Sequence, residues 1–84
     1  MHANILYTDY FCFMRLNDVA EGKTVFIKYI AGESREIERL SALGISCGSK
    51  LVVLYSQKKG GCVVVADGEP VGLSAGLCRR VEVE

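Results

Sequence analysis

Hydrophobic residues recur at two different spacings along this chain, and the spacing changes at a glycine. Ile37, Leu40 and Leu43 lie three residues apart, which places them along one side of a helix. Gly44 follows them, and glycine commonly takes the left-handed conformation that ends a helix. In that arrangement Leu40 and Ile45 become the apolar pair that closes a Schellman motif. The pattern therefore predicts a short helix that stops at Gly44.

The start of this helix carries residues that favour a helix N-terminus. Ser34 is the predicted N-cap, and Glu36 lies in the first turn, where a negative charge interacts favourably with the helix dipole. A helix of roughly ten residues is only marginally stable alone in water. We therefore expect this helix to be held by packing on a sheet.

The rest of the chain is divided into short β-branched and aromatic runs, which predict strands. The strands are expected over residues 24–30, 51–55, 62–66, 71–73 and 80–83. Residues 67–70 predict a turn, and Ser74 is expected to cap a single helical turn over residues 75–79. A loop over residues 16–23 carries two apolar anchors, Leu16 and Val19. The order predicts a mainly β fold with one short helix, as in a small, partly open antiparallel barrel of the SH3-like kind.

The hairpin over residues 51–66 has apolar residues on both faces of its two strands. A small barrel fills one face of each strand and normally leaves the other in water. Either the helix and the N-terminal aromatic residues cover the second face, or a partner protein does.

Residues 1–13 form an aromatic extension ahead of a domain expected over residues 14–84. Four of the seven aromatic residues lie in it, namely Tyr7, Tyr10, Phe11 and Phe13. It is expected to add an edge strand or to pack across an apolar surface. Residues 1–13 and the hairpin over residues 51–66 are also the segments through which two copies of the chain are expected to associate, if they do.

Length and charge exclude several functions. With 84 residues the chain makes one domain, and its ten basic and ten acidic side chains cancel. A neutral chain has no general field to attract nucleic acid or an anionic membrane. The longest apolar runs are five residues, against roughly twenty for a spanning helix. We expect a cytoplasmic protein that neither inserts into the membrane nor binds nucleic acid.

The residues that carry chemistry are too few for a catalytic site. His2 is the only histidine, and no Ser/His/Asp or Cys/His set can be assembled around it. Gly60-Gly61 lacks the Lys-Ser/Thr of a phosphate-binding loop and is interpreted as a hairpin turn. We therefore expect no enzyme activity.

The four cysteines contain no Cys-x-x-Cys pair, whereas dedicated zinc sites use closely spaced ligands. We expect buried or half-buried thiols, with no cofactor and no resident metal. The cysteines are Cys12, Cys47, Cys62 and Cys78.

A longer pattern resembles a known family. The segment Arg39-Leu40-x-x-Leu43-Gly44-Ile45-x-x-Gly48 is similar to the FeoA family. So are Leu16-x-x-Val19-x-x-Gly22 before it and Leu51-x-Val53, Gly68-x-x-Val71-x-Leu73 and Val81-x-Val83 after it. The resemblance covers residues 14–84. Two positions depart from the family pattern: Cys47 stands where proline is common, and Cys78 where a small residue is usual.

The resemblance implies a non-enzymatic cytosolic accessory protein of ferrous iron transport, which docks on the cytoplasmic part of a FeoB-type transporter and modulates it. The partner-binding residues we predict are on the helix, at its exit and on the hairpin tip: Arg35, Glu38, Arg39, Ser46, Lys58 and Lys59. Each of them is otherwise interpreted as an ordinary solvated side chain. The alternative function is an SH3-like module that binds iron or zinc and is related to the C-terminal domain of metal-dependent repressors.

Overall fold

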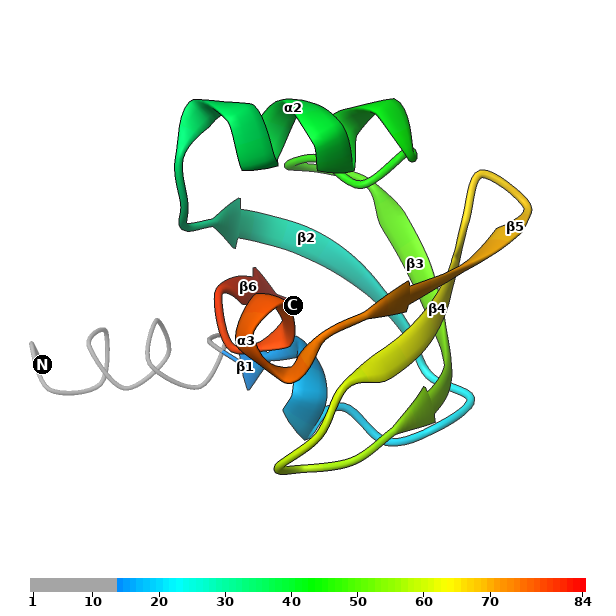
Figure 1. Ribbon diagram of the computed structural model, residues 1–84. Coiled ribbons are helices and arrows are strands. Elements are labelled where there is room, and N and C mark those ends of the chain that lie inside the picture. Colours follow the sequence, from blue (N-terminus) through cyan, green and yellow to red (C-terminus); the bar gives the residue numbers. More distant parts are fainter. Residues whose placement is uncertain (1–13) are drawn as a thin grey trace, which may run out of the picture.

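The computed structural model describes residues 14–84, which form six antiparallel strands and three short helical segments (Figure 1). This confirms the expected mainly β architecture. The strands run in the order β1-β6-β2-β3-β4-β5 across the sheet. Their bounds are β1 (Met14–Arg15), β2 (Thr24–Ile30), β3 (Lys50–Ser56), β4 (Cys62–Ala66), β5 (Glu69–Leu73) and β6 (Val81–Val83). The helical segments are the 3-10 helix η1 (Leu16–Asp18), α2 (Ser34–Ala42) and α3 (Ala75–Cys78).

Strand β2 belongs to both halves of the barrel. Its first half pairs with β3, where Val25 lies opposite Leu51, and its second half pairs with β6, where Ile30 lies opposite Val81. The register of the β2–β6 pair shifts between Ile27 and Tyr29, which marks a bulge. A bulge bends a strand and increases its twist, so one strand can contribute to two differently oriented parts of the sheet. Figure 1 shows β2 crossing the molecule between its two neighbours.

The core lies inside this curved sheet and is made of side chains that alternate along the strands. In β4 the buried residues Cys62, Val64 and Ala66 alternate with half-buried Val63 and Val65. Leu16 and Val19 are buried as expected, because η1 and the residue after it place both against the core. Among residues 14–84 the largest fully buried side chains are Leu16, Ile45, Leu51, Val53, Val64, Val81, Val83 and Cys78.

Helix α2 begins one residue earlier than the sequence predicted. Glu33 is the N-cap and Ser34 is the first helical residue, so the prediction of Ser34 as N-cap is wrong. The reason is a reciprocal capping box, in which the N-cap residue pairs with an acidic residue three positions later. Glu33 has that partner, because the Oε1 atom of Glu36 accepts a hydrogen bond from the Glu33 N–H at 3.4 Å. The residue three positions after Ser34 is Ile37, which cannot supply this bond.

The exit of α2 is the predicted Schellman motif. Gly44 has a φ of 86°, the Ile45 N–H donates to the Leu40 carbonyl at 2.9 Å, and the Gly44 N–H donates to the Ser41 carbonyl at 2.9 Å. The spacing of Leu43 predicts a position on the buried side of the helix, but its side chain is 49% exposed. The reason is that the helix ends at Leu43, which is its C-cap, and the residue that packs in the core at this end is the fully buried Ile45.

The turn between β4 and β5 is shorter than predicted. Asp67 and Gly68 both have positive φ, 52° and 79°, and Ala66 lies opposite Glu69, which defines a two-residue hairpin turn. Strand β5 therefore starts at Glu69 and not at residue 71, and Pro70 is tolerated because β5 is an edge strand.

Helix α3 starts as predicted, because the Ser74 Oγ accepts a hydrogen bond from the Leu77 N–H at 3.2 Å. Within residues 14–84, none of the helices has the length and apolar character needed to cross a membrane.

Candidate interaction surface

The outward face of β2, β3, β4 and β5, which we call the outer face, carries several apolar side chains together with the polar Thr24 and Lys50. Val52 lies opposite Val65, and Val65 lies opposite Pro70, so these three residues share one row across three strands. Phe26, Leu54 and Tyr55 extend the outer face and are 48%, 50% and 48% exposed. The apolar second face noted in the sequence is therefore real. Within residues 14–84, α2 leaves these three side chains about half exposed.

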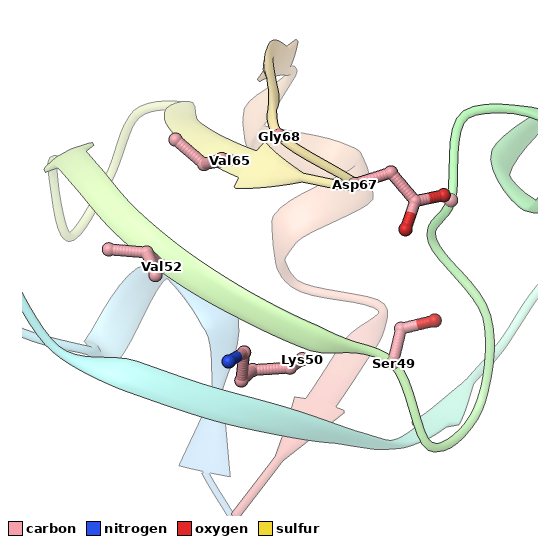
Figure 2. Close-up of a pocket in the computed structure, with 7 residues that line it drawn as sticks. Ser49, Lys50, Val52, Val65, Asp67 and Gly68 are labelled. Atoms are coloured by element: carbon pink, nitrogen blue, oxygen red, sulfur yellow. The ribbon is translucent and has the colours of Figure 1, made fainter.

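A pocket of about 260 Å³ lies where the exit of α2 meets the outer face (Figure 2). Val52 and Val65 give it apolar walls, and Lys50 and Asp67 add one cation and one anion. Its volume is below that of typical small-molecule pockets, which start at about 300 Å³. Its lining residues are Gly44, Ser49, Lys50, Val52, Val65, Asp67 and Gly68.

The pocket depends on a close approach between two turns. A Cβ atom placed on Gly44 would lie 2.5 Å from the Oδ2 atom of Asp67 and 2.8 Å from its Cγ. Figure 2 shows the Asp67 side chain reaching from the β4–β5 turn toward the loop after α2. A side chain at residue 44 would therefore be disfavoured twice, by the left-handed backbone and by the Asp67 carboxylate that it would displace.

Three of the predicted partner-binding residues lie on one exposed face of α2. Arg35, Glu38 and Arg39 are all exposed, and spacings of three and four residues bring them to the same side of the helix. Ser46 lies at the helix exit and is half-buried. Its N–H donates to the Ser49 Oγ at 3.1 Å, and the two hydroxyl oxygens are also 3.1 Å apart. Ser46 therefore shapes the exit loop as well as bordering it.

Lys58 and Lys59 lie at the other end of β3. Both are exposed in the β3–β4 connection, whereas Ser46 precedes the start of β3, so the strand separates the two groups (Figure 1). The connection is fixed by Asn17, which the sequence did not single out. Its Nδ2 atom donates to the Lys58 carbonyl at 2.9 Å, and Asn17 is the buried polar residue of the described chain. The six predicted residues thus form two separate groups.

Helix α2 is fastened at its first turn by an ion pair. The Arg80 guanidinium makes a bidentate interaction with the Glu36 carboxylate, at 2.6 Å from Nη1 to Oε1 and 3.1 Å from Nη2 to Oε2. This hydrogen-bonded charge lowers the pKa of Glu36 below its ordinary value and raises that of Arg80. The pair commits the Arg80 side chain to α2.

The cysteines of the described chain do not form a metal site with other ligands. Residues 14–84 contain no group of three or more His, Cys, Asp or Glu side chains placed to hold a metal ion. Cys62 and Cys78 are buried as expected, but Cys47 is exposed, because it lies in the loop after α2. Cys12, His2 and the predicted roles of residues 1–13 lie outside the described residues.

Comparison with known proteins decides the family. Residues 14–84 match the family described as "FeoA domain", which is every residue that the structure describes. The chain belongs to the FeoA family. This confirms the resemblance seen in the segment from Arg39 to Gly48. The chain is also 33% identical, over 64 residues, to the protein named "Putative Fe(2+) transport protein A" of Methanocaldococcus jannaschii. The aligned part covers 76% of this chain and 77% of that protein.

Solved structures show the same fold. The crystal structure of an iron uptake regulatory protein (FeoA) has a TM-score of 0.77 at 24% identity, over 86% of this chain and 96% of that one. The solution structure of FeoA from Chlorobium tepidum has a TM-score of 0.74 at 24% identity, over 84% and 69%. A manganese-dependent transcriptional repressor gives 0.73 at 23% identity, over 84% of this chain but 40% of the repressor. These matches confirm the SH3-like barrel of the FeoA family.

Proposed function

We propose that this protein is a non-enzymatic accessory protein of ferrous iron transport. It docks on the cytoplasmic part of a FeoB-type transporter and modulates it. The observation that carries the proposal is the match of all described residues to the FeoA family. The name of the related protein from M. jannaschii, which refers to Fe(2+) transport, supports the same process. The proposal places the protein in the cytoplasm, where that part of the transporter lies.

The docking surface we propose is the exposed side of α2 with its exit. Interfaces commonly have a small apolar centre inside a polar, charged rim. Here the half-exposed Leu43 and the pocket beside Gly44 supply the centre, and Arg35, Glu38 and Arg39 supply the rim. Helix α2 is held at its start by Glu36–Arg80 and at its end by Leu40 and Ile45, so it presents this surface without having to fold first.

Docking changes the transporter only if this protein binds one of its states more tightly than the others. The difference in binding free energy then biases nucleotide turnover or gating toward that state. Lys58 and Lys59 offer a second contact at the far end of β3. A single partner would have to extend along the hairpin to reach both groups.

The experiment is a titration of this protein against the purified cytoplasmic nucleotide-binding domain of its transporter. We expect Arg35→Glu/Arg39→Glu to weaken binding about tenfold, or about 1.4 kcal/mol, because it reverses two rim charges. Lys58→Glu/Lys59→Glu makes the same change in charge at the other end of the hairpin. It is the matched variant that shows whether the hairpin tip takes part. The absence of binding by the unmodified protein at high micromolar concentration would refute the proposal.

The metal-binding alternative rests on likeness of fold to metal-dependent repressors, and residues 14–84 hold no cluster of three ligands that favours it. Equilibrium dialysis of the full chain with iron(II) and with zinc tests it directly. Iron(II) prefers oxygen and nitrogen ligands, whereas thiols favour zinc or copper, so the metal retained would also identify the ligand type.

A further inference from the structure

Two cysteines from different elements meet in the core. Cys62 is the first residue of β4 and Cys78 is the last residue of α3, and their Sγ atoms lie 2.7 Å apart. Cys62 is 3% exposed and Cys78 is 0% exposed. The Cys78 thiol also points to the Leu73 carbonyl, at 3.8 Å. The fold thus brings together two thiols that are 16 residues apart in sequence, with no polar side chain between them.

The placement of the two sulfur atoms suits a covalent bond more than a metal ion. Their separation lies between the about 2.05 Å of a disulfide bond and an ordinary contact of two sulfurs, so there is no room for an ion between them. No third ligand is near, since the described residues contain no group of three metal-binding side chains. Forming the bond requires only the removal of two hydrogen atoms and a small inward movement of the two side chains.

The pair is also electronically asymmetric. The hydrogen bond between the thiols lowers the pKa of Cys78 and raises the pKa of Cys62, and the nearby charge of Arg79 also lowers that of Cys78. Cys78 is therefore the first of the two to lose its proton. This asymmetry belongs to the folded protein, and once α3 has opened either cysteine can supply the reactive thiolate.

We propose that Cys62 and Cys78 form a redox-active dithiol, which a low-molecular-weight disulfide of the glutathione type converts into an intramolecular disulfide. The thiolate of one of the two cysteines attacks one sulfur of the small disulfide and releases the other half as a thiolate, which takes up a proton. The other cysteine then loses its proton and attacks the sulfur of the first, and the second half of the small disulfide leaves as a thiol. The protein loses two electrons and two protons, and one small disulfide becomes two small thiols.

Neither sulfur is accessible in the folded protein, so the reaction takes place while α3 is open or before it has formed. Helix α3 has only four residues, and its N-terminus is held by the Ser74 hydroxyl. Such short, lightly held elements open more readily than the sheet core. Once formed, the bond fixes the end of α3 to β4. Arg80, whose ion pair holds α2, lies two residues after the end of α3. The disulfide would therefore lie close in sequence to the ion pair that holds the proposed docking helix.

The test uses the full chain carrying Cys12→Ser/Cys47→Ser, which leaves Cys62 and Cys78 as its only thiols. The reduced protein is incubated with glutathione disulfide, and in a second arm it is refolded from denaturant in a glutathione redox buffer. We expect a mass two hydrogens lower, no retained glutathione, and a Tm higher on the order of 10 °C than that of the reduced form. Dithiothreitol should reverse both changes.

The controls are Cys62→Ala and Cys78→Ala in the same background, which should show neither the mass change nor the rise in Tm. The refolding arm removes the question of access, because both thiols are exposed in the unfolded chain. If both thiols remain reduced in that arm, or carry only glutathione adducts or bonds between two chains, the proposal is wrong. A disulfide that forms but leaves the Tm unchanged would also overturn the proposed clamping of α3.

Discussion

Replacing Gly44 by alanine tests the construction of the helix exit and the pocket together. Gly44 has a φ of 86°, and a Cβ on it would lie 2.5 Å from the Asp67 carboxylate. Gly48, four residues later, has a φ of 90° but nothing within 4 Å of its Cβ position. The two glycines share one backbone conformation and differ in their surroundings. Gly48→Ala is therefore the matched control for Gly44→Ala.

The expected magnitudes follow from this difference. A residue with a Cβ lowers the stability of the folded protein by about 1–2 kcal/mol when its backbone is left-handed. Alanine offsets part of this loss, because it reduces the conformational entropy of the unfolded chain relative to glycine. We expect Gly48→Ala to lower the free energy of unfolding by about 1 kcal/mol. Gly44→Ala must in addition displace Asp67, which we take as about 1 kcal/mol because that side chain can rotate into solvent. The corresponding decreases in Tm are about 5 °C for Gly48→Ala and about 10 °C for Gly44→Ala.

Urea unfolding followed by circular dichroism measures both variants, and Asp67→Gly completes a double-mutant cycle. Removing the Asp67 side chain should reduce the cost of Gly44→Ala to that of Gly48→Ala, because only the backbone term is left. The cost of Gly48→Ala should not depend on residue 67. If Gly44→Ala is no more destabilising than Gly48→Ala, or if Asp67→Gly gives no relief, the close approach at the pocket is not a real constraint.

Three further predictions concern stability. Gly61→Ala should destabilise the protein by about 2–3 kcal/mol in urea unfolding, because its Cβ would collide with a backbone carbonyl. Gly60→Ala should cost less, because its Cβ meets only a flexible side chain. Equal losses of stability in the two variants would contradict this. Glu36→Gln removes the pair with Arg80. The pKa of Glu36 is lowered in the folded protein, so the charged carboxylate stabilises the fold. The difference in free energy of unfolding between the unmodified protein and Glu36→Gln should therefore be full above about pH 5 and decrease as pH falls below about 4. A difference that does not depend on pH would contradict the ion pair. Val53→Ala, at a fully buried position, should cost about 1.5–3 kcal/mol by thermal unfolding, and a cost below 0.5 kcal/mol would be unexpected.

Local rules of sequence predicted the parts of the fold that depend on neighbours in the chain. The exit of α2 at Gly44 depends on residues no more than five apart, and Ser74 caps α3 through a bond to Leu77. The strand over Thr24–Ile30 has the predicted bounds. Ser34 failed as N-cap because the choice of cap depends on which residue has an acidic partner three positions later. That rule was also local, so the sequence contained the signal.

The contacts that organise the candidate surface are not local, and the sequence did not indicate them. Arg80 pairs with Glu36 across 44 residues, and Asn17 holds the Lys58 carbonyl across 41. Helical spacing correctly grouped the exposed side chains of α2. The separation of Lys58 and Lys59 from Ser46 was already implied by the predicted strand over residues 51–55, because that strand lies between them in the sequence. The pocket combines three segments of chain, and only the folded sheet brings them together.

Strand β2 joins the two parts of the sheet, and this has a consequence for how the molecule unfolds. Detaching this strand would break the hydrogen bonds to β3 and to β6 in one event. The two parts of the sheet are therefore coupled through β2, and we expect the amide protons that β2 shares with β3 and with β6 to exchange with solvent through the same transition. Folding is subject to the same coupling. β2 emerges early in synthesis but stays half-paired until the distant β6 segment is available, which favours slow, all-or-none assembly.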